Sequence, residues 1–272
     1  MNDINPTPEF DVIDTEWRRR EHLKYAFTIG AALCCATAFS FAGGFEFSRY
    51  EGAPSTVLKL AADSWPPDFS RWREWGRPLL ETLATGVTGT VLGAALALPF
   101  AALAAQNIGP SPFIRQSVRI FLNAIRSLPG LIWGVIFVAA IGFGPLPGAF
   151  ALGVHSTGML GKLFFEAMEH VDPSPGAALK AHGASELAVF RFAVLPQAVP
   201  RLVDALIYRF EHNLRAATTL GVIGAGGLGL QIVTAFHLFE YKEASALIIL
   251  LLIVVTAVNL LGARVRRRLL AL

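Results

Sequence analysis

The chain has 272 residues, of which 54% are hydrophobic and only 16% are charged, and its mean hydropathy is +0.52. Soluble domains typically carry about 25% charged residues, so this composition excludes an ordinary soluble protein and indicates a membrane protein. The formal net charge of +3 does not indicate nucleic-acid binding, because the basic residues stand at the ends of apolar runs, where they orient membrane spans.

The first element is a polar segment, residues 1–24, which precedes an apolar run at about 25–43. A cleaved signal peptide shares this pattern, but more long apolar segments follow, so we expect a retained membrane span. Cys34 and Cys35 lie within the run and have neither metal-ligand nor disulfide-framework spacing. We assign this span and the polar, tryptophan-bearing outer loop after it to a segment comprising residues 25–78.

A core region, residues 79–263, holds the remaining apolar segments. Each has about the 20 residues that a helix needs to cross the hydrocarbon core of a bilayer. The expected spans are residues 80–105, 118–141, 147–168, 199–222 and 245–263.

The sequence therefore predicts a polytopic, all-α membrane protein with about six spans. Basic residues near both chain ends, including a basic tail at 264–272, place both termini on the cytoplasmic side of the membrane. The first outer loop also carries several Lys and Arg residues, against this rule, and is the weakest part of the predicted topology.

Two nucleotide-binding patterns are incomplete. Residues Gly224–Gly229 have the spacing of a dinucleotide-binding loop, but they follow a membrane span rather than a strand. Gly161 and Lys162 resemble the end of a phosphate loop, but Leu163 stands where Ser or Thr is required. The His, Cys, Asp and Glu residues show no metal-ligand spacing. We therefore expect no ATP site, metal site or catalytic residue in this chain.

A polar segment at residues 169–198 is the predicted coupling loop on the inner face. An Asp or Ser near its start can cap a short helix. Gly183 interrupts that helix, and Ser185 can cap a second one, which we expect from Glu186 to Val194.

This loop resembles that of ABC importer permeases, which carries E-A-A, three residues, Gly, nine residues and an I-x-L-P-like ending. Ala178 matches the first Ala, Gly183 the Gly and Ala193–Pro196 the ending, although Ala193 stands where Ile is common. Ala177 and Leu179 replace the Glu and the second Ala, which weakens any inference of a particular ion pair. The resemblance implies contact with an ATPase through Ala177, Ala178, Lys180, His182, Gly183, Ala184, Ser185, Leu195 and Pro196.

A closer resemblance covers residues 75–262 and points to phosphonate transporter permeases. It is carried by Arg126–Pro129, the coupling loop, Phe210–Thr218 and Gly224–Gly229. It implies the type I importer fold, with two permease copies side by side, two ATP-binding subunits that hold ATP and Mg, and an extracytoplasmic phosphonate-binding protein. The resemblance also implies a location in the lipid of a bacterial cytoplasmic (inner) membrane, and no nucleic-acid partner is expected.

A polar stripe on the fifth predicted span is the candidate translocation path. At about 100° per residue, its members share one side of a helix, with a histidine at the margin, and ionisable groups within a membrane face the bundle interior or a water-filled cavity. Glu211 and Arg215 are spaced to pair, so the stripe either lines the path or holds two helices together. The path candidates are Arg126, Ser127, His155, Tyr208, Glu211, His212, Arg215, Thr218 and Thr219, with Asp204 on the same stripe.

The function expected from these features is the import of a phosphonate or a related phosphorus oxyanion by alternating access, driven by ATP that a partner hydrolyses. Phosphite, phosphate and methionine are the rival substrates. An intramembrane enzyme and an assembly scaffold are the rivals outside transport.

Overall fold

The computed structural model describes residues 8–270, which are almost entirely helical and contain no strand. The chain divides into two units, which meet between Ala62 and Asp63. The first unit consists of α1 (Pro8–Phe41), a short 3-10 helix (Phe47–Tyr50) and most of α2 (Ala53–Asp63).

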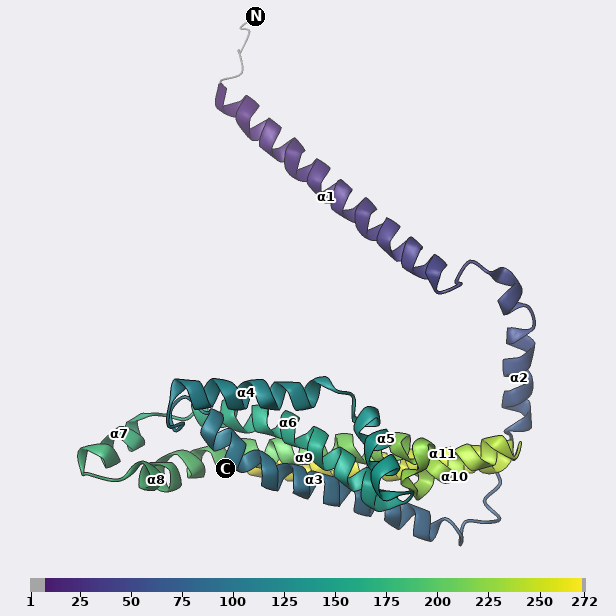
Figure 1. The fold of residues 1–272 in the computed structure, drawn as a ribbon. Coiled ribbons are helices and arrows are strands. Elements are labelled where there is room, and N and C mark those ends of the chain that lie inside the picture. The colour runs from purple at the N-terminus through teal and green to yellow at the C-terminus, as the bar shows by residue number, and fades with distance from the viewer. Residues whose placement is uncertain (1–7, 271–272) are drawn as a thin grey trace, which may run out of the picture. The chain divides into compact units, whose positions relative to one another are not determined.

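The second unit is a helical bundle that contains the predicted core region. Helices α3, α6 and α9 run along one another, while α7 and α8 project from one end and α5, α10 and the start of α11 lie at the other (Figure 1). The helices are α3 (Gly76–Ala104), α4 (Pro112–Ser127), α5 (Gly130–Ile141), α6 (Pro145–Glu169), α7 (Ser174–Ala181), α8 (Glu186–Val189), α9 (Leu195–Leu220), α10 (Gly227–His237) and α11 (Tyr241–Leu270).

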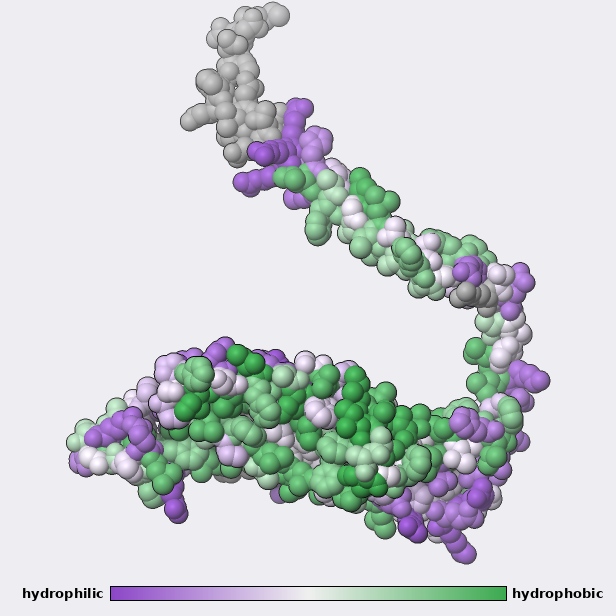
Figure 2. Space-filling view, viewed as in Figure 1, coloured by the Kyte–Doolittle hydropathy of each residue, from purple (hydrophilic) through white to green (hydrophobic). Residues whose placement is uncertain are grey.

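Helix α6 is the centre of this bundle and packs against α3, α4, α5 and α9. Glycines allow the closest of these contacts, because a Cβ atom added at Gly89 or Gly93 of α3 would collide with Leu152 or Ser156 of α6. Small residues bring membrane helices together in this way. The surface of the unit is hydrophobic over its middle and hydrophilic at its ends (Figure 2), as expected of a bundle that crosses a bilayer.

Three of the described helices are long and apolar enough to cross a membrane: Trp17–Phe41 of α1, Gly76–Ala104 of α3 and Tyr241–Arg268 of α11. Two bent pairs, α4 with α5 and α8–α9 with α10, raise the number to five if each pair is one span. The count of about six therefore depends on α6, which lies outside this set. Its polar residues are shielded by neighbouring helices, with Ser156 and Thr157 at most 2% exposed.

The predicted span at residues 118–141 consists of two helices rather than one. Helix α4 ends at Ser127, α5 begins at Gly130, and the two helices are bent by 82°. Pro129 explains the break, because the residue before a proline is pushed out of the helical region; Leu128 has a ψ of 126°. Helix α5 therefore runs in a different direction from α4.

The glycine-rich segment breaks the chain as predicted. Gly224, Gly226 and Gly227 all have positive φ, between 71° and 99°, a region that side chains other than glycine rarely adopt. The helix after the break, α10, turns away by 58°. This helix comprises residues Gly227–His237. Their conformation was not predicted from the sequence.

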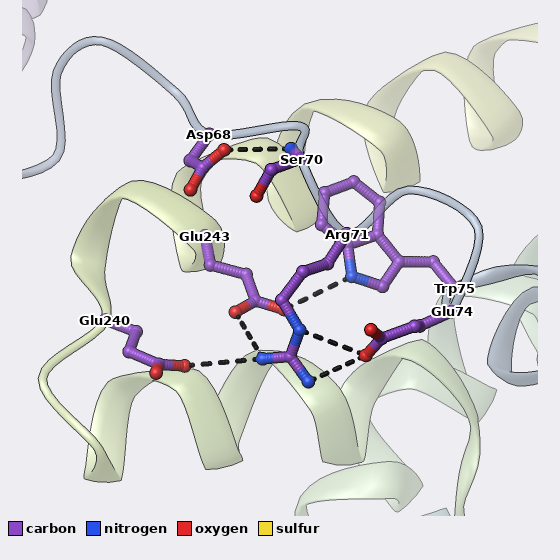
Figure 3. A network of polar contacts seen from close by, with 7 residues as sticks. All are labelled: Asp68, Ser70, Arg71, Glu74, Trp75, Glu240 and Glu243. Atoms are coloured by element: carbon purple, nitrogen blue, oxygen red, sulfur yellow. Dashed lines mark hydrogen bonds and ion pairs between the residues drawn. The ribbon is translucent and has the colours of Figure 1, made fainter.

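The end of the bundle opposite α7 and α8 is held by a polar network around Arg71 (Figure 3). The Arg71 guanidinium lies 2.7 Å from Glu74 and 2.9 Å from Glu243, and the Trp75 indole N–H donates to Glu243 at 3.3 Å. The hydrogen bond to Glu74 and the charge of Glu243 raise the pKa of Arg71 above its usual value. This network joins the segment before α3 to the start of α11.

Candidate functional site

Helix α9 connects the coupling loop directly to the middle of the bundle. The second loop helix, α8, continues through a π-helical turn (Phe190–Val194) into α9 without a break. We expected this helix to stop before Leu195 and Pro196, and that expectation is wrong, because a proline is tolerated in the first turn of a helix. Residues Glu186–Ala225 therefore form one continuous helical segment from the loop into the bundle.

A pocket of about 300 Å³ lies where α9 faces α6 and the start of α5. Two arginines and two histidines supply its polar groups, and the rest of its lining is glycine, threonine and aliphatic. The lining residues are Gly130, Leu131, Leu152, His155, Arg209, His212, Arg215, Ala216, Thr219 and Leu220.

Arg209 is the most deeply buried of these charges, with only 2% of its surface exposed. Its Nε donates to the Ser156 hydroxyl at 2.8 Å, and its Nη2 lies 2.6 Å from Nδ1 of His155. A guanidinium can only donate, so Nδ1 of His155 accepts and the ring proton belongs on Nε2. Both partners are neutral groups from α6.

A buried polar network centred on the next turn of α9 holds Arg209 in place. Asn213, one turn further along α9, donates to the Ser156 hydroxyl and to Thr90 of α3, each at 2.9 Å. Thr90 in turn donates to the carbonyl of Gly86. Satisfied networks of this kind stabilise one arrangement of a core, and here they fix the guanidinium against α6.

Among the residues whose side chains the structure describes (17–48 and 50–268), no Asp or Glu lies within ion-pair distance of Arg209 or Arg215. The start of α5 adds to the positive potential, since Gly130 and Leu131 line the pocket and Pro129 provides no side-chain cap for their N–H groups. An uncapped helix N-terminus attracts anions. The pocket is therefore suited to bind an anion.

The structure brings together four of the predicted path residues and separates the others. His155, His212, Arg215 and Thr219 all line the pocket. The pair that the spacing of Glu211 and Arg215 allows does not form. Glu211 instead accepts a hydrogen bond from Arg266 of α11 at 2.7 Å.

The remaining candidates lie outside the pocket lining. Tyr208 is half exposed on α9, and the Thr218 hydroxyl contacts the Leu214 carbonyl of its own helix at 3.5 Å. Arg126 and Ser127 end α4, where Arg126 donates to Asn123 at 3.0 Å. These two residues immediately precede the bend that brings the start of α5 to the pocket.

Comparison with known proteins gives the family of the chain. Residues 97–270 match the family of binding-protein-dependent transport system inner membrane components. The chain belongs to this family. It is therefore a transport permease with several membrane-spanning helices.

Individual relatives agree with this assignment. The chain is 46% identical to the phosphite transport system permease protein PtxC of Stutzerimonas stutzeri, over 79% of this chain and 78% of that protein. It is 38% identical to the phosphate-import permease protein PhnE of Mycolicibacterium smegmatis, over 70% of this chain and 36% of that protein. A solved structure of the MetNI methionine ABC transporter in an inward-facing conformation has the same fold, with a TM-score of 0.64 at 23% identity over 72% of this chain and 95% of that one.

The coupling loop of this permease has the predicted helix–turn–helix form. Gly183 has a φ of 78°, and the Ser185 hydroxyl accepts from the N–H of Ala188 at the start of α8. Lys180 and Glu186 bridge the two helices at 2.7 Å. Most of the predicted contact residues are exposed, namely Ala177, Ala178, Lys180, His182, Gly183, Ser185 and Pro196, while Ala184 and Leu195 are half-buried.

Sequence reasoning missed Arg209, the residue with the clearest role in the pocket. The helical stripe was built on Glu211 and Arg215, and Arg209 lies off its centre line. An arginine in the middle of a predicted span is by itself a sign of function, so the signal was present. Ser156 and Asn213 gave no such signal, because polar uncharged residues are common between membrane helices.

Proposed function

We propose that the permease passes a small phosphorus oxyanion through the pocket around Arg209, as the membrane subunit of an ATP-driven importer. The observation that carries this proposal is the charge of Arg209, which is buried without a carboxylate partner. A buried charge is costly unless it is paired. A transported anion is a partner that the pocket accepts and releases.

The chemistry of the lining fits such an anion. A phosphorus oxyanion presents several acceptor oxygens, and a guanidinium fork matches that geometry. Arg209 is fixed by Ser156 and His155, whereas Arg215 is exposed and has no ion-pair partner among the described residues. One buried, fixed arginine and one exposed arginine allow an ion to be bound and passed on, which conduction requires.

The relatives order the candidate substrates. The phosphite permease relative is 46% identical over 79% of this chain, whereas a putative cryptic phosphonate permease of Escherichia coli is 39% identical over 43% of it. Phosphite is therefore the first substrate to test, ahead of the phosphonate that the sequence motifs favoured. Phosphate follows, and methionine lacks the compact, multiply charged head that the pocket fits.

A second copy of the chain is proposed to complete the path. Tyr208, His212, Arg215 and Thr219 form an exposed polar face along α9, and polar groups within a membrane face other protein or water rather than lipid. A homodimer with the two α9 helices facing each other covers this face. Each copy then docks one ATP-binding subunit, which holds ATP and Mg, on α7 and α8.

The same arrangement sets the orientation in the cytoplasmic membrane. The loop of α7 and α8 faces the cytoplasm, together with the basic end of α11 and the N-terminus. The end around Arg71 faces outward, where an extracytoplasmic binding protein delivers the anion. Alternating access follows when the ATPases close and displace the coupling helices.

Reconstitution in proteoliposomes with the cognate ATPase and binding protein tests this function. ATP-dependent uptake of labelled phosphite is expected, and phosphonate and phosphate compete with it more strongly than methionine does. Uptake of methionine but of no phosphorus oxyanion contradicts the proposal. Chemical conversion of the anion without net uptake favours the intramembrane enzyme instead.

A further inference from the structure

A second charged site lies at the coupling-loop end of the bundle, outside the pocket and the loop helices. Arg119 of α4 donates to the carbonyl of Ala104, the last residue of α3, through Nε at 3.0 Å and Nη2 at 2.8 Å. The same Nη2 pairs with Glu169, the last residue of α6. One guanidinium therefore joins the ends of two helices to a third.

The pair is largely shielded from solvent by its neighbours. The side chains of Arg119 and Glu169 are only 22% and 19% exposed, and the Phe165 ring lies 4.5 Å from the guanidinium. Glu169 also accepts from the backbone N–H of Gln106 at 2.7 Å. Asn107 adds a further link, donating to the carbonyl of Met168 at 2.8 Å.

Electrostatics explains why a cation is needed there. The C-terminal ends of α3 and α6 converge, and each carries the partial negative charge of its unsatisfied carbonyls. Glu169 adds a full negative charge to the end of α6, an unfavourable position on its own. Arg119 offsets all three, so its loss leaves the ends of α3 and α6 repelling each other.

The coupling loop connects α6 to α9, and its second helix runs into α9 without a break. Helix α8 continues into α9, and the Gln197 side chain of α9 accepts from the N–H of Asp172 at 3.1 Å and donates to its carbonyl at 3.2 Å. A hollow of about 370 Å³ is lined by Asn107 and Glu169 together with Lys180 and Val189 of the loop. A movement of α8 therefore reaches α9 through a continuous helix, whereas Arg119 ties the end of α6 to α3 and α4.

We infer that Arg119 and Glu169 are positioning residues that hold α6 to α3 and α4, so that a stroke of the coupling helices moves α9 against α6. The place where α9 meets α6 is the pocket, through the contacts of Arg209 with His155 and Ser156. If α6 were free to follow α9, the stroke would leave these contacts unchanged. The inference rests on the proposed import function.

The test measures coupling rather than activity alone, in the reconstituted full complex. Arg119→Met removes the donors but keeps an apolar stem over Phe165. Arg115→Met, one turn earlier on α4, is the matched control, because Arg115 makes no ion pair among the described residues. Co-purification with the ATPase and the thermal midpoint check that both variants assemble.

Arg119→Met is expected to lower the number of anions imported per ATP hydrolysed by about tenfold, within the usual range of coupling between sites. Its ATP hydrolysis is also expected to lose its dependence on the loaded binding protein. Glu169→Gln, which keeps an acceptor, is expected to fall between Arg119→Met and the wild type. The control should match the wild type in both measurements.

The inference is overturned if Arg119→Met imports as many anions per ATP hydrolysed as the wild type does. If uptake and hydrolysis both fall but in proportion, Arg119 serves folding alone. Absence of anion uptake by the wild type contradicts the proposed function instead. In that case the dependence of ATP hydrolysis on the binding protein still decides the role of Arg119.

Discussion

Two faces of helix α9 treat charge in opposite ways. On the face toward α11, Glu211 and Asp204 lie 2.7 Å and 3.9 Å from Arg266, so the cation is paired within the chain. On the face toward α6, Arg209 is 2% exposed and contacts only neutral groups of Ser156 and His155. The first face is built like a scaffold, and the second leaves a charge for an external partner.

The comparison shows that the role of a charged side chain, in stabilising the bundle or in binding the anion, follows from its burial and its partners together and not from its charge alone. An intrahelix pairing of Glu211 with Arg215 would have neutralised one of the two arginines of the pocket. Because Glu211 pairs with Arg266 of α11 instead, the charge of Arg215 stays available beside that of Arg209. Substitutions on the two faces of α9 test this difference, and the largest effect is expected on the paired face.

Removing one member of the paired face should destabilise the protein most. Glu211→Gln leaves Arg266 largely buried without its main partner, and breaking such a pair typically costs about 3–5 kcal/mol. The expected result is a lower thermal midpoint and less assembled complex, measured by unfolding in detergent and by co-purification. Adding Arg266→Gln should restore most of the loss, whereas adding Arg215→Gln should not. Rescue by Arg215→Gln would instead support the pair within α9.

Removing the unpaired charge should spare assembly and abolish transport. Arg209→Met deletes the charge-assisted hydrogen bonds that the guanidinium is proposed to donate to the anion, and such bonds are worth about 1.5–3 kcal/mol each. Labelled phosphite uptake should therefore fall at least about tenfold. Arg209→Lys keeps the charge without the fork and should retain part of the activity. An assembled Arg209→Met complex with full uptake would remove Arg209 from the path.

The sequence predicted one face of α9 better than the other for a physical reason. Helical spacing gives the direction of each side chain, which grouped His212, Arg215 and Thr219 correctly on the pocket. It does not say which neighbouring helix fills each direction. The partner of Glu211 is Arg266, which lies 55 residues away, and only the packing of α11 on α9 brings them together.

The bend that completes the site was predictable in principle. Pro129 stood inside the predicted third span, and a residue before proline disfavours the helical conformation. We gave more weight to the length of the apolar run than to this signal. The coupling loop was predicted more accurately, because Gly183 and Ser185 act through local backbone geometry and capping, which depend on few distant residues.

A change in the coupling loop should have a smaller energetic effect but a clear functional one. Gly183 has a φ of 78°, and a residue with a side chain costs roughly 1–2 kcal/mol in this region. Gly183→Val should tilt α7 relative to α8 and lower uptake while the permease remains inserted. Unchanged uptake in proteoliposomes would show that the bend does not transmit the ATPase stroke to α9.

The smallest effect is expected at Arg215, the exposed arginine of the pocket. Its charge is open to solvent or to a second copy, and exposed charges contribute about 0.2–1 kcal/mol per interaction. Arg215→Gln should leave the thermal midpoint unchanged and lower uptake a few-fold, more so at low salt. A loss of stability in this variant would place Arg215 in the scaffold beside Glu211.

Protection of the pocket by its anion tests the unpaired face most directly. Thr219→Cys places a thiol in the lining of the pocket, in a background where the exposed Cys34 and Cys35 are replaced by serine. Phosphite should slow labelling of this thiol in the full complex, methionine at the same concentration should not, and Arg209→Met should abolish the protection. Labelling that phosphite leaves unchanged, or slows equally in Arg209→Met, would contradict the account of Arg209 as the anion-binding charge of the permease.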